Sequence, residues 1–150
     1  MSPEQLSFDG RADEVSAVTV FFDGGSRGNP GPSAIGAVVV DPSEDPPRVL
    51  ATVSECIGTT TNNVAEYRAA IAGLEAARAM GARSVKVRGD SKLVIEQLAG
   101  RWRVKQPHLV PLHAQARALI AGFERVELGH VRRELNTDAD ALVNAALDLA

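Results

Sequence analysis

The sequence predicts an α/β fold: a mixed five-stranded sheet flanked by helices. Three strand-like apolar runs come first, and segments with helical spacing then alternate with two further short strands, in the order βββαβααβα. The chain has 150 residues, 45% hydrophobic and 23% charged, which is ordinary composition for one globular domain. We therefore expect one core, an antiparallel beginning to the sheet, and parallel strands where helices connect them.

The first three elements are read as strands because they are rich in β-branched residues and are bounded by turn residues. They span 16–23, 34–41 and 49–56, separated by a glycine-rich segment (24–31) and a proline-rich loop (41–48). The loop is too short for a crossover helix, so the second and third strands should pair antiparallel.

In the later elements, segments whose apolar residues have helical spacing alternate with short apolar strands, and capping residues bound the helices. Helices are predicted over 63–80, 91–99, 109–122 and 136–150, and strands over 85–89 and 126–131. Gly81 and Gly100 are the expected helix ends. The candidate N-cap residues are Thr60, Thr61 and Asn62 for the first helix and Asn136 or Thr137 for the last.

Residues 1–14 are polar and acidic without apolar periodicity, so we expect a flexible tail before a single domain at 15–150. The tail lacks the basic start and apolar run of a secretory signal, and no stretch has membrane-spanning length. The single Cys56 cannot form an internal disulfide and is expected as a buried thiol in a strand. These features favour a cytoplasmic protein without membrane contact, expected as a monomer.

Four acids stand at positions where an acid rarely has a structural role. Asp23 and Asp90 end strands, while Glu66 and Asp140 lie about one turn into helices that follow strands. In open α/β sheets such positions gather at one edge. Clustered carboxylates repel one another unless cations neutralise them, and hard oxygen ligands suit Mg²⁺. Asp138 falls on another helix face and is interpreted as a first-turn acid that favours the helix dipole.

The net charge of −3 and the pI near 5.6 argue against a broadly basic nucleic-acid surface. If cations fill the acidic cluster, the remaining surface is close to neutral and any basic contact must be local. Arg101, Arg103 and Lys105 surround Trp102 in one such segment. Trp102 is interpreted as a cover on the core in preference to a base-stacking residue.

Four segments in this order resemble the type 1 ribonuclease H family from Val18 onward. They are Asp23–Gly31, Thr61–Glu66, Gly89–Lys92 and Asn136–Asp140. The runs 90–97 and 100–105 are more similar to the compact actinobacterial and archaeal branch, which lacks the basic protrusion of longer members. The resemblance implies a ribonuclease H-like fold.

The resemblance also implies an endonuclease that hydrolyses the RNA strand of RNA/DNA hybrids and leaves 5′-phosphate and 3′-hydroxyl ends. Two Mg²⁺ ions, or Mn²⁺, would be held by Asp23, Glu66, Asp90 and Asp140, with Asp23 bridging. Short polar groups would read 2′-hydroxyls and backbone shape. The implied substrate-binding residues are Gly24, Gly25, Ser26, Asn29, Thr61, Asn62, Asn63, Lys92 and Arg133.

The chain departs from the better-known family pattern at three places. Val64 replaces a basic residue, and Lys92 stands where many members have Gln. The loop before the last helix is short and lacks the mobile His that many members use in product release, so Arg133 is expected to replace it. None of the three His residues is assigned to catalysis.

Other interpretations remain open for single residues and for the chain. Asp23 alone is compatible with a turn former, Glu66 with a solvated helix acid, and Asp90 with a residue of a helix cap. A non-catalytic hybrid-binding module and a same-fold DNA nuclease are the alternative functions. A phosphatase with an Asp nucleophile is disfavoured because Gly25 stands where its second acid would be, and a P-loop because the Gly-Lys-Ser/Thr ending is missing.

Overall fold

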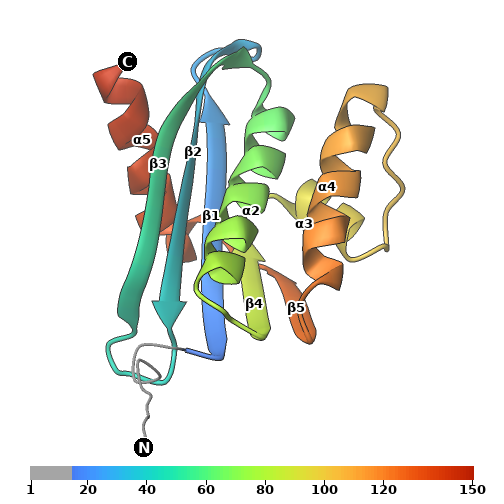
Figure 1. The fold of residues 1–150 in the computed structure, drawn as a ribbon. Coiled ribbons are helices and arrows are strands. Elements are labelled where there is room, and N and C mark those ends of the chain that lie inside the picture. The colour runs from blue at the N-terminus through green and yellow to red at the C-terminus, as the bar shows by residue number, and fades with distance from the viewer. Residues whose placement is uncertain (1–14) are drawn as a thin grey trace, which may run out of the picture.

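The computed structural model describes residues 15–150, so the predicted tail at 1–14 lies outside the described residues. Within 15–150, a five-stranded sheet has the strand order β3-β2-β1-β4-β5, with helices on both faces (Figure 1). The strands are β1 (Ala17–Ser26), β2 (Gly31–Asp41), β3 (Arg48–Thr60), β4 (Ser84–Gly89) and β5 (Arg125–His130). The helices are α2 (Asn62–Ala79), α3 (Lys92–Leu98), α4 (Val110–Ala121) and α5 (Thr137–Leu149).

The predicted element order and mixed sheet are confirmed. Strand β2 pairs antiparallel with β1 and β3, while β4 pairs parallel with β1 and β5. The prediction that Asp23 ends its strand is wrong, because Gly24, Gly25 and Ser26 continue β1 by pairing with β2. The parallel partner β4 instead stops at Gly89, opposite Phe22. Asp23 is therefore the first residue of β1 beyond the parallel pairing.

The two faces of the sheet carry cores of different size. Val18, Val20 and Phe22 point from β1 into the larger core, which α2, α3 and α4 cover. Within residues 15–150, the opposite face is covered by α5, in a smaller cluster of Ala34, Val143, Ala146 and Leu147. Successive residues of a strand alternate between the faces, so β1 contributes side chains to both layers.

The first predicted helix is capped by Thr61 as expected, Ser91 caps α3 in the same way, and the predicted cap residue Asn136 forms a different bond. The hydroxyls of Thr61 and Ser91 accept hydrogen bonds from the N–H groups of Val64 and Val94, each at 3.3 Å. Asn136 occupies the N-cap position of α5, yet its amide donates to the Phe22 carbonyl at 2.9 Å instead of capping the helix. This bond ties the start of α5 to β1.

Two burial predictions are wrong. Cys56 is exposed on β3, which is an edge strand, and its thiol donates to the Ala146 carbonyl at 3.0 Å. Trp102 is 44% exposed in the segment after α3, so it does not cover the core. Cys56 lies on the edge strand β3, and Trp102 lies in the segment that follows α3, so neither is enclosed by the described residues. Among residues 15–150, none of the helices combines the length and the apolar character needed to cross a bilayer.

Candidate active site

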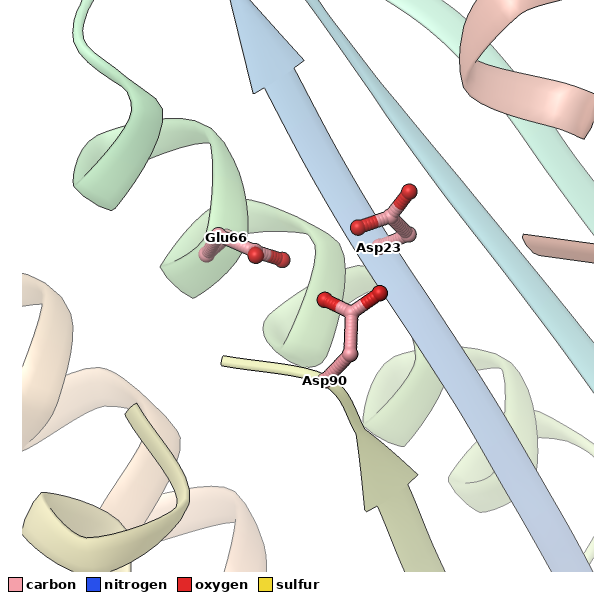
Figure 2. A group of neighbouring side chains, drawn as sticks. All are labelled: Asp23, Glu66 and Asp90. Atoms are coloured by element: carbon pink, nitrogen blue, oxygen red, sulfur yellow. The ribbon is translucent and has the colours of Figure 1, made fainter. Parts of the chain in front are cut away.

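Three carboxylates from separate elements meet at the point where β4 ends. Asp23 on β1, Glu66 on α2 and Asp90 after β4 point toward one another (Figure 2), and their oxygens lie within 4.8 Å of one another. Asp23 and Asp90 are neighbours because β1 and β4 run parallel and Phe22 pairs with Gly89. Carboxylate oxygens at this spacing can coordinate a common divalent cation.

Glu66 reaches this group because Gly24 lets α2 approach the strand. A Cβ atom at Gly24 would lie 2.2 Å from the Ala65 carbonyl carbon, so no side chain fits between β1 and the helix. The Gly24 N–H donates to Glu66 Oε1 at 2.8 Å and orients the carboxylate. The glycine therefore serves helix packing as well as the local shape of the cleft.

Asp140 reaches the cleft from α5, which packs on the opposite face of the sheet. Gly36 lets α5 approach the sheet there, as Gly24 does for α2. Gly36 pairs with Asp23 across β1 and β2, and a Cβ there would lie 2.4 Å from the Ala139 carbonyl oxygen. Asp140 lies close enough to Asp23 to raise the pKa of that carboxyl, and the Asp140 Oδ2 accepts a bond from Asn144 Nδ2 at 3.3 Å. Asp140 is outside the three-carboxylate group but lines the same cleft.

Burial and mutual repulsion favour protonation of two of these acids. Burial, followed by the charges of Asp90 and Asp140, raises the pKa of Asp23 to about 8, while Arg133 opposes the shift. Burial, followed by Asp23 and Asp90, raises the pKa of Glu66 well above its usual value, against the Gly24 N–H and Arg133. Among the described residues, Arg133 opposes these shifts but does not neutralise the cluster.

The donor atoms fit a hard divalent cation. Asp90 Oδ2 is buried, and no group of the described residues donates a hydrogen bond to it. Such an atom is unfavourable unless something satisfies it. The residues that line the cleft include neither Cys nor His, so the ligands on offer are oxygens, which suit Mg²⁺ or Mn²⁺.

The four acids line a cleft of about 480 Å³. Five of the predicted substrate-binding residues line it as well: Gly24, Gly25, Ser26, Asn62 and Arg133. Arg133 is exposed in a short 3-10 helix (η3, Arg133–Leu135) just before α5. It is close enough to lower the pKa values of Asp23 and Glu66, which places a cation beside the cluster.

The remaining predicted substrate residues lie beside the cleft, outside its lining. Asn29 Oδ1 accepts from the Asn62 N–H at 3.1 Å, and Asn62 Oδ1 accepts from the Ser26 N–H at 2.9 Å. Thr61 caps α2, and the partly buried Asn63 is in its first turn. Lys92 lies over the Trp102 ring, with its Nζ 5.9 Å from the ring centroid. The asparagines thus join the β1–β2 turn to the start of α2.

The sequence interpretation missed several residues of the site. Ser91, Asn144 and Arg27 line the cleft, and Asn136 is a buried anchor for α5. Asn144 was detectable, because a residue four positions after Asp140 shares its helix face. Arg27 carried no such signal. Asp138 is exposed and does not line the cleft, in agreement with its interpretation as a first-turn acid.

Comparisons with known proteins agree with this geometry. A family profile described as "Reverse transcriptase-like" matches residues 21–146. Ribonuclease HI of Halobacterium salinarum is 44% identical over 147 residues, which cover 98% of this chain and 72% of that protein. The chain therefore belongs to the type 1 ribonuclease H family.

One further relative and two solved structures are also similar to this chain. A bifunctional protein of Mycobacterium tuberculosis is 52% identical over 133 residues, 89% of this chain but only 36% of that protein, so the chain spans about a third of such curated relatives. The structure of its N-terminal RNase H domain has a TM-score of 0.86 at 50% identity, covering 90% of this chain and 96% of that one. The structure of LC11-RNase H1 in complex with an RNA/DNA hybrid has a TM-score of 0.82 at 39% identity, covering 88% and 97%.

Proposed function

We propose that this protein is an endonuclease that hydrolyses the RNA strand of RNA/DNA hybrids and leaves 5′-phosphate and 3′-hydroxyl ends. The observation that carries the proposal is the group of Asp23, Glu66 and Asp90, whose oxygens lie within 4.8 Å of one another in an open cleft. Support also comes from the LC11-RNase H1 structure, whose bound molecule is such a hybrid.

The cofactor is proposed to be a pair of Mg²⁺ ions, with Mn²⁺ as a substitute, held by Asp23, Glu66, Asp90 and Asp140. When bound, two divalent cations activate water and stabilise charge on the attacking and leaving oxygens. The buried, unpartnered Asp90 Oδ2 and the raised pKa values of Asp23 and Glu66 support this ligand set, because both features are relieved by a bound cation.

The chain's own contribution is to hold these carboxylates in position before a substrate arrives. The Gly24 N–H orients Glu66, the Asn144 amide orients Asp140, and the Asn136 amide fixes the start of α5 to β1. Outer hydrogen bonds of this kind preorganise ligands and are worth about 10- to 100-fold in metal affinity or activity. Arg133, beside the cluster, is proposed to assist phosphate binding and product release.

Substrate choice is proposed to depend on the short polar groups next to the cleft. The backbone of Gly24–Ser26 would contact the RNA strand together with Asn29, Asn63 and Glu66. The DNA phosphate would lie near Thr61, Asn62 and Asn29. Lys92 would contact a phosphate. A hybrid duplex displays its 2′-hydroxyls in a wide, shallow minor groove, which such groups can reach. Recognition would follow backbone shape rather than base sequence.

The test compares four labelled substrates of one sequence in Mg²⁺: the hybrid, double-stranded RNA, duplex DNA and a DNA junction. We expect cutting of the RNA strand of the hybrid alone, with 5′-phosphate ends identified by their reaction with a phosphatase. Equal cutting of duplex or junction DNA would favour the same-fold DNA nuclease. Tight hybrid binding without cutting in Mg²⁺ or Mn²⁺ would favour the non-catalytic module.

A further inference from the structure

The cleft continues beyond the carboxylates as a groove between β1 and α5. Its α5 lining is Asp140, Val143, Asn144 and Leu147, which form one stripe along the helix. On the facing side, β1 contributes consecutive small residues, and a Cβ at Gly25 would lie 3.3 Å from Val143 Cγ1. The stripe spans eight residues of helix, from Asp140 to Leu147, which is a length of roughly 10 Å. The groove is therefore long enough for more than the reacting phosphate.

Arg27 lines this groove where β1 has ended and the turn to β2 begins. Its N–H donates to the Pro32 carbonyl at 2.8 Å, so the turn backbone is held in place. Its guanidinium Nη2 lies 2.6 Å from Asp148 Oδ1 in the last turn of α5. Both side chains are open to solvent, at 49% and 67% exposure. Arg133 precedes α5, so each end of the groove has an arginine.

We propose that Arg27 binds a backbone phosphate of the strand being cut, a few nucleotides from the carboxylates, and that Asp148 competes with this phosphate for Arg27. The inference rests on the proposed function of the same cleft. An exposed ion pair is weak because water screens it, so its partners exchange readily. A phosphate accepts paired, charge-assisted bonds from a guanidinium, which favours the exchange when a nucleic acid is bound.

A structural tie is the other role open to the pair, because it joins the β1–β2 turn to the end of α5. The two roles predict opposite effects of neutralising Asp148. If Arg27 binds phosphate, Asp148→Asn frees the guanidinium and lowers KM. If the pair is a tie, Asp148→Asn and Arg27→Ala both loosen the groove and change KM in the same direction.

The experiment measures hybrid cleavage over a series of NaCl concentrations. Arg27→Ala is expected to raise KM several-fold, with a smaller effect on kcat, and to reduce the slope of log KM against log salt by about one. Arg27→Lys keeps the charge and is expected to keep the slope. Asp148→Asn is expected to lower KM by about two- to fivefold, as befits the loss of a weak competing pair.

The matched control is the ion pair of Arg83 and Glu124, which is similarly exposed but does not line the groove. Its atoms lie 3.5 Å apart, and Arg83 immediately precedes β4, at the strand end opposite the carboxylates. Arg83→Ala and Glu124→Gln are expected to leave KM and the salt slope unchanged. An Arg27→Ala slope equal to that of wild type, or a raised KM in Asp148→Asn, would overturn the proposal.

A binding assay separates this inference from the proposed function. In an Asp23→Asn background, fluorescence anisotropy with a labelled hybrid gives Kd and its salt slope without cleavage. A wild-type protein that cuts no hybrid defeats the proposed function, while the Arg27→Ala slope in binding still decides the role of Arg27. The absence of any hybrid binding would defeat both.

Discussion

The carboxylates of the cleft and those of the outer surface differ in what surrounds them. On the surface, hydrogen bonds and the positive charge of Arg101 and Arg88 lower the pKa values of Glu96 and Glu127. In the cleft, burial and neighbouring acids raise the pKa of Asp23 to about 8, with Arg133 opposing only in part. Glu96 and Glu127 are thus each paired with an arginine, whereas among the described residues the cleft acids have mainly one another and Arg133 as charged neighbours.

This difference shows that the cleft acids, rather than the surface ion pairs, favour the binding of a cation. Exposed ion pairs are weak because water screens them. Buried acids that repel one another destabilise the metal-free fold once they ionise, and that repulsion is relieved when a cation binds the folded state. The repulsion that makes the cleft unfavourable without metal therefore also favours the binding of a cation.

The largest expected effect comes from neutralising the central acid. Asp23→Asn should lower hybrid cleavage in Mg²⁺ by at least about a hundredfold, because losing even an outer partner of a metal ligand lowers activity about 10- to 100-fold. Initial rates on the labelled hybrid measure this. Asp138→Asn, on an exposed position off the cleft, should cut at the wild-type rate. Equal rates for Asp23→Asn and wild type would refute the site.

The second prediction concerns Gly24, which lets α2 pack close enough to β1 for Glu66 to reach the other acids. Gly24→Ala introduces a methyl group 2.2 Å from the Ala65 backbone, so α2 must move, and we expect a loss of about 1 to 3 kcal/mol in the free energy of unfolding. Urea denaturation measures the change. The control is Gly122→Ala, whose Cβ would approach the Leu119 carbonyl oxygen at 3.4 Å, an ordinary contact. Comparable losses in both variants would contradict the packing argument.

The third prediction is the pH dependence of the metal-free protein. The folded state holds protons on Asp23 and Glu66 that the unfolded state releases near pH 4, so stability should fall as pH rises from about 5 through about 8. Glu96 and Glu127 have lowered pKa values, so they stabilise the folded state while they are ionised. That contribution is lost only at lower pH, where these two acids become protonated.

Urea midpoints in EDTA between pH 5 and 8 measure this slope, and the double variant Asp23→Asn with Glu66→Gln serves as the reference. Wild type should lose stability relative to the reference as pH rises, and Mg²⁺ should restore it. A wild-type midpoint that rises with pH more than that of the reference would show that the pKa values of Asp23 and Glu66 are not raised in the folded state.

The smallest expected effect is at a surface pair. Glu127→Gln removes the charge beside Arg88, but the Arg88 guanidinium keeps its bonds to the carbonyls of Val87 and Glu127, each at 3.1 Å. The melting temperature should change only slightly, and less in 0.5 M NaCl than in dilute buffer. A shift as large as that of Gly24→Ala would mean that the surface pairs contribute more than the comparison assumes.

Much of the fold was predictable because its signals are local. Strand and helix periods, the caps at Thr61 and Ser91 and the glycine at the end of α2 all depend on residues close in the chain. The predicted end of β1 was wrong, because pairing with β2 outweighs the weak strand preference of the glycines. The exposure of Cys56 and Trp102 also depends on which elements happen to cover them.

The sequence by itself determined the order of the elements, the identity of the four acids, and the positions of Asp90 after a strand and of Glu66 and Asp140 near helix starts, since these follow from periodicity and residue type. The tertiary structure decided which acids share a cation, how far the pKa values of Asp23 and Glu66 rise, and that Arg27 meets Asp148 from 121 positions away. The reason is that repulsion and desolvation depend on distance and burial in space, and packing of α2 and α5 against opposite faces of β1 sets both.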